Sequence, residues 1–104
     1  MYTIIETPTF KVEADKLWTE DERLEFFTWL AADPDIGTVI PGSGGCRKVR
    51  WSRRGLGKRG GVRVIYFNRL SSGEIWLLLV YPKSKKDSIP AHLLKAIREV
   101  IEND

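Results

Sequence analysis

Apolar residues follow a strand pattern and then a helical pattern at the start of the chain. Residues 2–6 are rich in β-branched side chains, which indicates a short strand. After a turn at residues 7–9, residues 10–17 repeat apolar side chains at helical spacing. The sequence therefore predicts a strand followed by a short helix.

A second helix is marked at both of its ends. Thr19 and Glu22 have the spacing of a capping box, and the first turn is rich in acidic residues, as the helix dipole favours. Asp33 and Pro34 end the helix. We expect its apolar stripe to pack on a sheet rather than to bind a partner. That stripe consists of Leu24, Phe27, Leu30 and Ala31.

The second half of the chain has the pattern of three strands, at residues 46–51, 62–69 and 74–81. The last of them is apolar at nearly every position, which is typical of a central strand covered on both faces. Residues 38–40 are compatible with a brief extended piece. The basic, glycine-rich connection between the first two strands is too long for a tight hairpin turn, so we expect a mobile loop.

A final helix follows, with Asp87 or Ser88 as its cap and Pro90 in its first turn. Its predicted apolar stripe consists of Leu93, Leu94, Ile97, Val100 and Ile101. The element order β-α-α-β-β-β-α predicts an α+β fold with a mainly antiparallel sheet of about four strands. A length of 104 residues fits a single domain over residues 1–104.

The period of two assigns the side chains of the first two of these strands to faces. Lys48 and Arg50 share one face with Cys46, and the opposite face carries Arg47, Val49 and Trp51. On the next strand, one face carries Arg63, Ile65, Phe67 and Arg69, and the other carries Val64, Tyr66 and Asn68. If the two strands are neighbours and these faces coincide, Lys48, Arg50 and Arg63 converge.

Charge is segregated along the chain. Residues 46–69 hold nine basic and no acidic side chains, whereas residues 1–35 hold nine acidic and three basic ones, a balance of −6. Charges farther apart than about 8–10 Å are largely screened from each other at physiological salt, so the two regions do not neutralise each other. A concentrated basic surface predicts a polyanionic partner, and RNA is the first candidate.

Several kinds of site are disfavoured by composition. One cysteine, Cys46, gives no internal disulfide, and a single histidine, His92, gives neither zinc spacing nor a catalytic triad. The Gly-Ser-Gly-Gly run at residues 42–45 lacks the lysine and the helix that follow a phosphate loop. Apolar runs are far shorter than the roughly 18 residues of a membrane span. We therefore expect a cytoplasmic protein with no signal peptide, no membrane partner and no metal or cofactor.

The converging cations suggest a chemistry. A crowd of positive charges binds phosphate and lowers the pKa of a lysine within it. Such a lysine can take the proton from a ribose 2′-hydroxyl while arginines stabilise the charged phosphorane. Non-catalytic binding by a solvated basic face is an equally good interpretation of composition alone. Among the aromatic residues of the strands, Trp51 and Tyr66 are expected in the core, and Tyr81 is the best candidate for stacking on a base.

The stretch GSGGCRKVRWSRRGLGKRGGVRVIYF resembles the HigB-type branch of the RelE/ParE superfamily of bacterial toxins, as does the apolar strand that ends in Tyr81, Pro82 and Lys83. The resemblance implies a RelE-like fold and a toxin of a type II toxin–antitoxin system. Such a toxin enters the A site of the 30S ribosomal subunit and cuts the mRNA there by metal-independent attack of the 2′-hydroxyl. A helix-turn-helix antitoxin of the HigA type is the implied partner.

The resemblance also implies roles for single residues. Lys48 and Arg50 stand where lysines act on the 2′-hydroxyl, and Arg63 matches the arginine that holds the phosphate. The resemblance also implies an arginine that acts as the general acid and a tyrosine that stacks on a base. Their positions fall near Ser84 and Ile89 in this chain, so we expect neighbouring lysines to replace the arginine. The expected catalytic residues are Lys48, Arg50, Arg63, Lys83 and Lys86, with Lys85 as a further substitute. The expected RNA- or ribosome-binding residues are Arg47, Arg53, Arg54, Lys58, Arg59, Lys85 and Tyr81.

Two alternatives stay open. A ParE-like inhibitor of DNA gyrase has the same fold without the nuclease cations, and the presence of Lys48, Arg50 and Arg63 argues against it. A non-catalytic RNA- or ribosome-binding module would carry the same cations and is not excluded by them.

Overall fold

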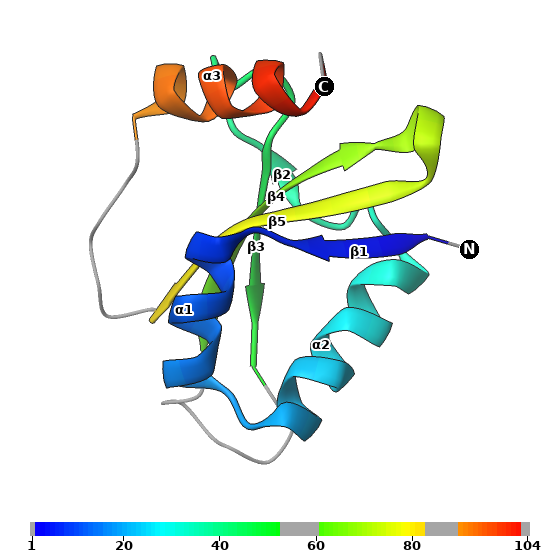
Figure 1. Cartoon of the computed structure of the whole chain (residues 1–104), viewed down its shortest axis with the longest axis vertical. Coiled ribbons are helices and arrows are strands. Elements are labelled where there is room, and N and C mark those ends of the chain that lie inside the picture. The colour runs from blue at the N-terminus through cyan, green and yellow to red at the C-terminus, as the bar shows by residue number, and fades with distance from the viewer. Residues whose placement is uncertain (1, 53–60, 83–89, 103–104) are drawn as a thin grey trace.

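A computed structural model describes residues 2–52, 61–82 and 90–102 (Figure 1). In this part of the chain, a five-stranded sheet and three α helices confirm the predicted α+β fold. The elements are β1 (Thr3–Glu6), α1 (Pro8–Leu17), α2 (Glu20–Ala32), β2 (Thr38–Val39), β3 (Arg47–Trp51), β4 (Val62–Arg69), β5 (Glu74–Pro82) and α3 (Ala91–Glu102), with a 3-10 turn at Leu70–Ser72.

The sheet has the strand order β1-β5-β4-β3-β2. β1 runs parallel to β5, and every other neighbouring pair is antiparallel. The sheet has one strand more than the expected four, because residues 38–39 pair with the start of β3. The expectation that the apolar strand 74–81 is covered on both faces is confirmed: Leu77 packs on one face of β5 and Leu78 on the other.

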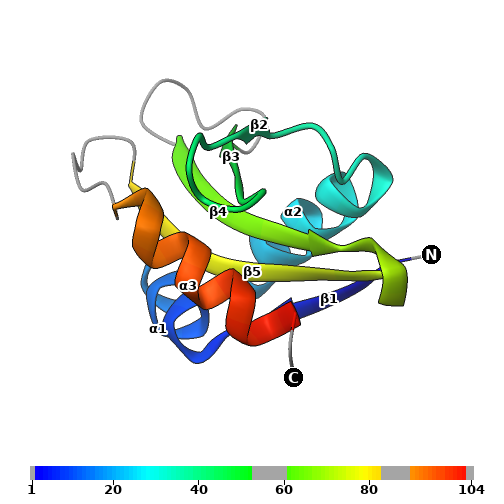
Figure 2. The same ribbon diagram turned by 90° about the horizontal axis from the view of Figure 1, so that it is seen from above.

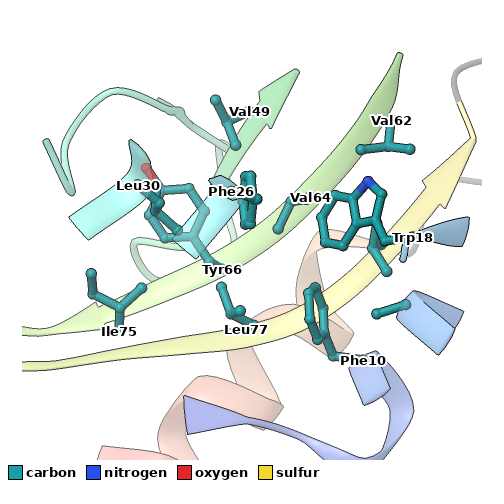
Figure 3. Packing of buried hydrophobic residues seen from close by; sticks show 12 residues of the cluster. Phe10, Trp18, Phe26, Leu30, Val49, Val62, Val64, Tyr66, Ile75 and Leu77 are labelled. Atoms are coloured by element: carbon teal, nitrogen blue, oxygen red, sulfur yellow. The ribbon is translucent and has the colours of Figure 1, made fainter. Parts of the chain in front are cut away.

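Helices cover the two faces of the sheet unequally. α1 and α2 lie on one face, and α3 lies on the other (Figures 1 and 2). The α1/α2 face holds the larger core, in which Phe10, Trp18 and Phe26 meet the side chains of β3, β4 and β5 (Figure 3). The smaller core under α3 consists of Cys46, Ile65, Phe67, Leu78, Tyr81, Leu94 and Ile101.

α1 begins earlier than the sequence pattern predicts. Thr7 is its N-cap and accepts a hydrogen bond from the Phe10 backbone N–H at 3.3 Å, and Pro8 takes the first helical position. The missing N–H of proline costs nothing there, because the first turn has no acceptor for it. The segment predicted as a turn is therefore the start of the helix. The Thr7 hydroxyl also donates to the Leu77 carbonyl at 2.8 Å, which fastens this start to β5.

The ends of α2 agree with the prediction, and its apolar stripe agrees in part. Thr19 and Glu22 form both hydrogen bonds of the capping box, and Asp33 is the C-cap. Phe26 and Leu30 are the buried residues, whereas Leu24 is 57% exposed. The aromatic partners of α2 decide this rotation, since Phe26 packs against Trp18, with ring centroids 5.0 Å apart. Leu30 and Phe27 of the predicted stripe therefore face the core as expected, whereas Leu24 was wrong.

α3 also buries less than predicted. Leu94 and Ile101, two turns apart, are buried. Three other members of the predicted stripe are exposed, namely Leu93, Ile97 and Val100. The helix contacts the sheet along a narrow line of side chains, so its buried residues are spaced two turns apart. The predicted caps Asp87 and Ser88 lie outside the described residues.

Candidate functional site

The strand register brings the predicted cations together. Lys48 pairs with Ile65, Arg50 pairs with Arg63, and Arg63 pairs in turn with Tyr81 of β5. Directly opposed residues of antiparallel strands project to the same face of a sheet, with side chains about 5 Å apart. Lys48, Arg50 and Arg63 therefore share the face that α3 partly covers, as the period of two predicts. We call these three residues the cation cluster.

The opposite side of β3 explains why the cation cluster is held in place. Val49 is buried between the two cations of its strand, and Trp51 packs edge-on against Trp18, with centroids 5.5 Å apart. Lys48 and Arg50 are exposed and Arg63 is half-buried. A strand anchored on one face by a large aromatic core presents its polar face with little freedom of the backbone. Trp51 therefore anchors the strand, as expected for a core residue.

No described acidic side chain pairs with the cation cluster. The ion pairs between described residues join Lys16 to Glu13, Arg23 to Glu6 and Asp15, Arg47 to Asp35, and Arg69 to Glu74. Three neighbouring cations that form no ion pair with a described residue create a local positive potential, which favours an anionic ligand. This is the electrostatic arrangement that a phosphate group requires.

Arg50 stands at the edge of this face. β2 pairs with β3 only as far as Lys48, so the part of β3 beyond it lies at the edge of the sheet. There Arg50 lines a hollow of about 490 Å³ together with Glu25, Trp29, Trp51 and Ser52. Arg50 and Lys48 are thus both exposed, whereas Arg63 is half-buried.

Tyr81 does not match the expectation of an exposed stacking platform. Its side chain is 7% exposed and packs in the core under α3. Burial raises the pKa of the Tyr81 hydroxyl, and the neighbouring charge of Arg63 partly opposes this. A buried ring cannot take a base onto its face, so Tyr81 is a core residue beside Arg63. The reason is its register, since β5 is covered on both faces up to its last residues.

Arg47 lies on the opposite face and has structural partners. Its guanidinium donates to the carbonyls of Asp35 and Gly37, at 3.1 and 2.7 Å, and lies 3.5 Å from the Asp35 carboxylate. The Tyr66 hydroxyl donates to the Pro34 carbonyl at 2.7 Å and accepts from the Gly37 N–H at 2.9 Å. Arg47 and Tyr66 therefore clamp the segment before β2, and Arg47 is not part of the cation cluster.

The remaining predicted site residues lie outside the described residues. They are Arg53, Arg54, Lys58, Arg59, Lys83, Lys85 and Lys86, together with the predicted basic loop. The flanking residues, however, are placed: Trp51 pairs with Val62, and Val62 pairs with Pro82. Trp51, Val62 and Pro82 therefore lie at the same end of the sheet as Arg50 and Arg63. Their roles stay predictions.

Other chemistry in the described part of the chain is limited. No group of three or more His, Cys, Asp or Glu side chains there is arranged to hold a metal ion. Burial raises the pKa of the Cys46 thiol, which is fully buried and lies 3.8 Å from the Leu94 carbonyl. His92 is exposed on α3. None of the helices in the described ranges is long and apolar enough to cross a membrane.

Sequence reasoning missed Arg98, a basic residue that the fold brings to the same side of the sheet. Arg98 of α3 lies over the ring of Phe67, with its guanidinium carbon 5.5 Å from the ring centroid. Phe67 shares the α3 face with Cys46 and Ile65. The sequence gives no indication that a basic residue of a helix will contact a strand more than 30 residues earlier in the chain.

Comparison with known proteins identifies the fold. No protein-family model matches the chain. Among solved structures, the chain is similar to a double arginine-to-alanine mutant of the E. coli toxin RelE in the free state. The match has a TM-score of 0.63 at 15% sequence identity, and it covers 93% of this chain and 96% of that chain. The chain therefore has a RelE-like fold, as the sequence resemblance implies.

Proposed function

We propose that this protein is a toxin of a type II toxin–antitoxin system that cleaves translated mRNA in the ribosomal A site. The observation that carries the proposal is the cation cluster: Lys48, Arg50 and Arg63 converge on one face of a RelE-like sheet without a described acidic partner. The residue pattern around the cluster supports membership of the HigB-type branch, and hence a HigA-type helix-turn-helix antitoxin as the partner.

The proposed reaction uses the substrate's own nucleophile. Lys48 accepts the proton of the ribose 2′-hydroxyl, and the 2′-oxygen attacks the adjacent phosphorus. Arg63 and Arg50 bind the non-bridging oxygens, whose negative charge grows in the phosphorane. The bond to the 5′-oxygen then breaks, and that oxygen takes a proton from a lysine beyond Pro82, either Lys83 or Lys86. The products are a 2′,3′-cyclic phosphate and a 5′-hydroxyl.

Tyr81 and Trp51 supply the framework of this reaction rather than contacts with bases. The buried Tyr81 ring lies across from Arg63 and limits where its guanidinium can go. Because no exposed aromatic side chain stands within the described cation cluster, we expect the ribosome to orient the mRNA and the intrinsic activity on naked RNA to be weak.

The test is cleavage by purified protein on ribosomes programmed with a defined mRNA, mapped by primer extension. We expect cuts inside the A-site codon for the wild type and a loss of at least about 100-fold for Arg63→Ala, because a phosphate ligand is removed. Arg69→Ala is the matched control, since Arg69 lies on the same strand and pairs with Glu74 at its far end. Equal rates for the two variants would contradict the proposal.

The two alternatives give different results in the same experiment. Intact mRNA together with nicked or stalled DNA in a gyrase assay identifies a gyrase inhibitor. Tight binding to ribosomes without any cut, and the same loss of binding in every cation variant, identifies a non-catalytic module.

A further inference from the structure

The turn at residues 42–45 is a rigid feature of the α3 face. Gly42, Gly44 and Gly45 have φ angles of 75°, 76° and 103°, a region that favours glycine. Fully buried Ser43 holds the turn: its hydroxyl donates to the Ile40 carbonyl at 2.6 Å and accepts from the Cys46 N–H at 3.0 Å. Gly44 and Gly45 are exposed at the surface of this turn.

Two cations of α3 lie directly against this turn. A methyl group placed on Gly44 would be 3.2 Å from Lys95 Cγ and 3.2 Å from Arg98 Cδ. The two side chains are three residues apart and so lie on one side of the helix. The sequence excludes a phosphate loop here because no lysine follows the glycines; the fold brings a lysine and an arginine to them from about 50 residues away.

Arg98 has a hydrogen-bond donor that lacks an acceptor. Its guanidinium lies over Phe67, and its Nε is buried without a partner. The charge of Arg98 also acts on the Cys46 thiol, whose pKa it lowers against the larger effect of burial. None of the ion pairs between described residues involves Lys95 or Arg98, although α3 also carries Glu99 and Glu102. An anion beside the turn would supply a counter-charge for both cations.

We infer that the Gly44–Gly45 turn together with Lys95 and Arg98 forms a second phosphate-binding site, which holds an RNA backbone phosphate beside the cation cluster. Cys46 directly follows the turn and lies two residues before Lys48, which is about 7 Å along a strand. Both sites face the same side of the sheet. The RNA identity of the ligand rests on the proposed function, whereas the anion site itself does not.

The first test is titration of ¹⁵N-labelled Lys48→Ala protein, in which cleavage is suppressed, with inorganic phosphate and then with a short single-stranded RNA. We expect both probes to shift the amide signals of Gly44 and Gly45. Lys95→Gln should lower RNA affinity and reduce the slope of log K against log salt by about 0.7, the value for one phosphate contact on a single strand. Unmoved glycine signals, or a shift with phosphate but none with RNA, would overturn the inference.

Two glycine variants form a matched pair. Gly44→Ala and Gly42→Ala impose the same backbone strain, but a methyl group on Gly42 meets only Ala91 Cβ at 3.5 Å. We expect Gly44→Ala to displace the two cations and weaken RNA binding about tenfold, and Gly42→Ala to leave it within twofold, at equal thermal stability. Equal affinities would overturn the inference. A wild type that binds RNA through this turn but never cuts it would instead overturn the proposed function alone.

Discussion

The two faces of the sheet use the same strands in opposite ways. On the α1/α2 face, β3 contributes Val49 and Trp51 to a closed core that also includes Trp18 and Phe26. On the α3 face, the alternate residues of β3 are Lys48 and Arg50, which are exposed and have no described acidic partner. The first face is closed by two helices, and the second is covered by one helix only in part.

This difference teaches how a small domain holds like charges together. Neighbouring cations repel each other, and their repulsion destabilises the sheet unless other contacts exceed it. Here the stabilising contacts are made by the neighbouring residues of the same strand, which point to the opposite face and are only about 3.3 Å away along the backbone. The aromatic core keeps β3 and β4 in register, and the register keeps Lys48, Arg50 and Arg63 together. Residues on one face of β3 therefore serve stability, and residues on the other face serve the proposed function.

The largest expected separation is between neighbouring residues of β3. Lys48→Ala should lower ribosome-dependent cleavage by a factor of about 10²–10⁴, because it removes the proposed base, and should leave the free energy of unfolding within about 0.5 kcal/mol. Arg47→Ala should do the reverse: it loses the clamp on residues 35–37, at a cost of about 1–3 kcal/mol, and keeps its cleavage rate. Cleavage assays and urea unfolding measure the two effects; a cleavage loss shared by both variants would contradict the separation.

The next largest effect lies in the core of the α1/α2 face. Phe26→Ala should lower the free energy of unfolding by about 3–5 kcal/mol, because it leaves a cavity among Trp18, Trp29 and Trp51. Leu24→Ala, on the same helix but 57% exposed, is the control and should change it by about 0.5 kcal/mol or less. Thermal unfolding compares the two. Similar costs would mean that α2 is rotated relative to this description.

A smaller effect tests the clamp before β2. Tyr66→Phe removes one hydroxyl and leaves the Pro34 carbonyl and the Gly37 N–H without this partner, which should cost about 1–3 kcal/mol of unfolding free energy. The cleavage rate of the folded variant should stay unchanged, because Tyr66 lies on the α1/α2 face. Loss of cleavage at full folding would show that the clamp also positions Lys48.

The smallest effect concerns pH. The Ser72 hydroxyl, the Trp76 indole N–H and the Arg69 guanidinium lower the pKa of Glu74 below its ordinary value of 4.5. A carboxylate with a lower pKa in the folded state adds stability above its unfolded pKa, and that stability is lost as pH falls through the folded pKa. The melting temperature of the wild type should therefore fall more steeply below about pH 4.5 than that of Glu74→Gln. Parallel curves would refute this contribution.

Local patterns predicted much of the fold and the core of the site. The capping box of α2, the three long strands and the shared face of Lys48, Arg50 and Arg63 all follow from short-range rules. The rotation of α2 did not follow, because the apolar positions Leu24, Phe26 and Phe27 offer two stripes and only Trp18 and Trp51 select between them. The burial of Tyr81 and the clamp made by Arg47 depend on partners distant in sequence, so no local pattern predicted them.

By itself, the sequence determined which side chains of β3 and of β4 stand together, because the pleat of a regular extended backbone repeats every two residues. Only the tertiary structure decided which faces met, which helix covered them and that Lys95 and Arg98 reach Gly44. These features depend on strand register and on the packing of segments far apart in the chain. The interactions that stabilise them form only between segments, so they cannot be derived from any one segment alone.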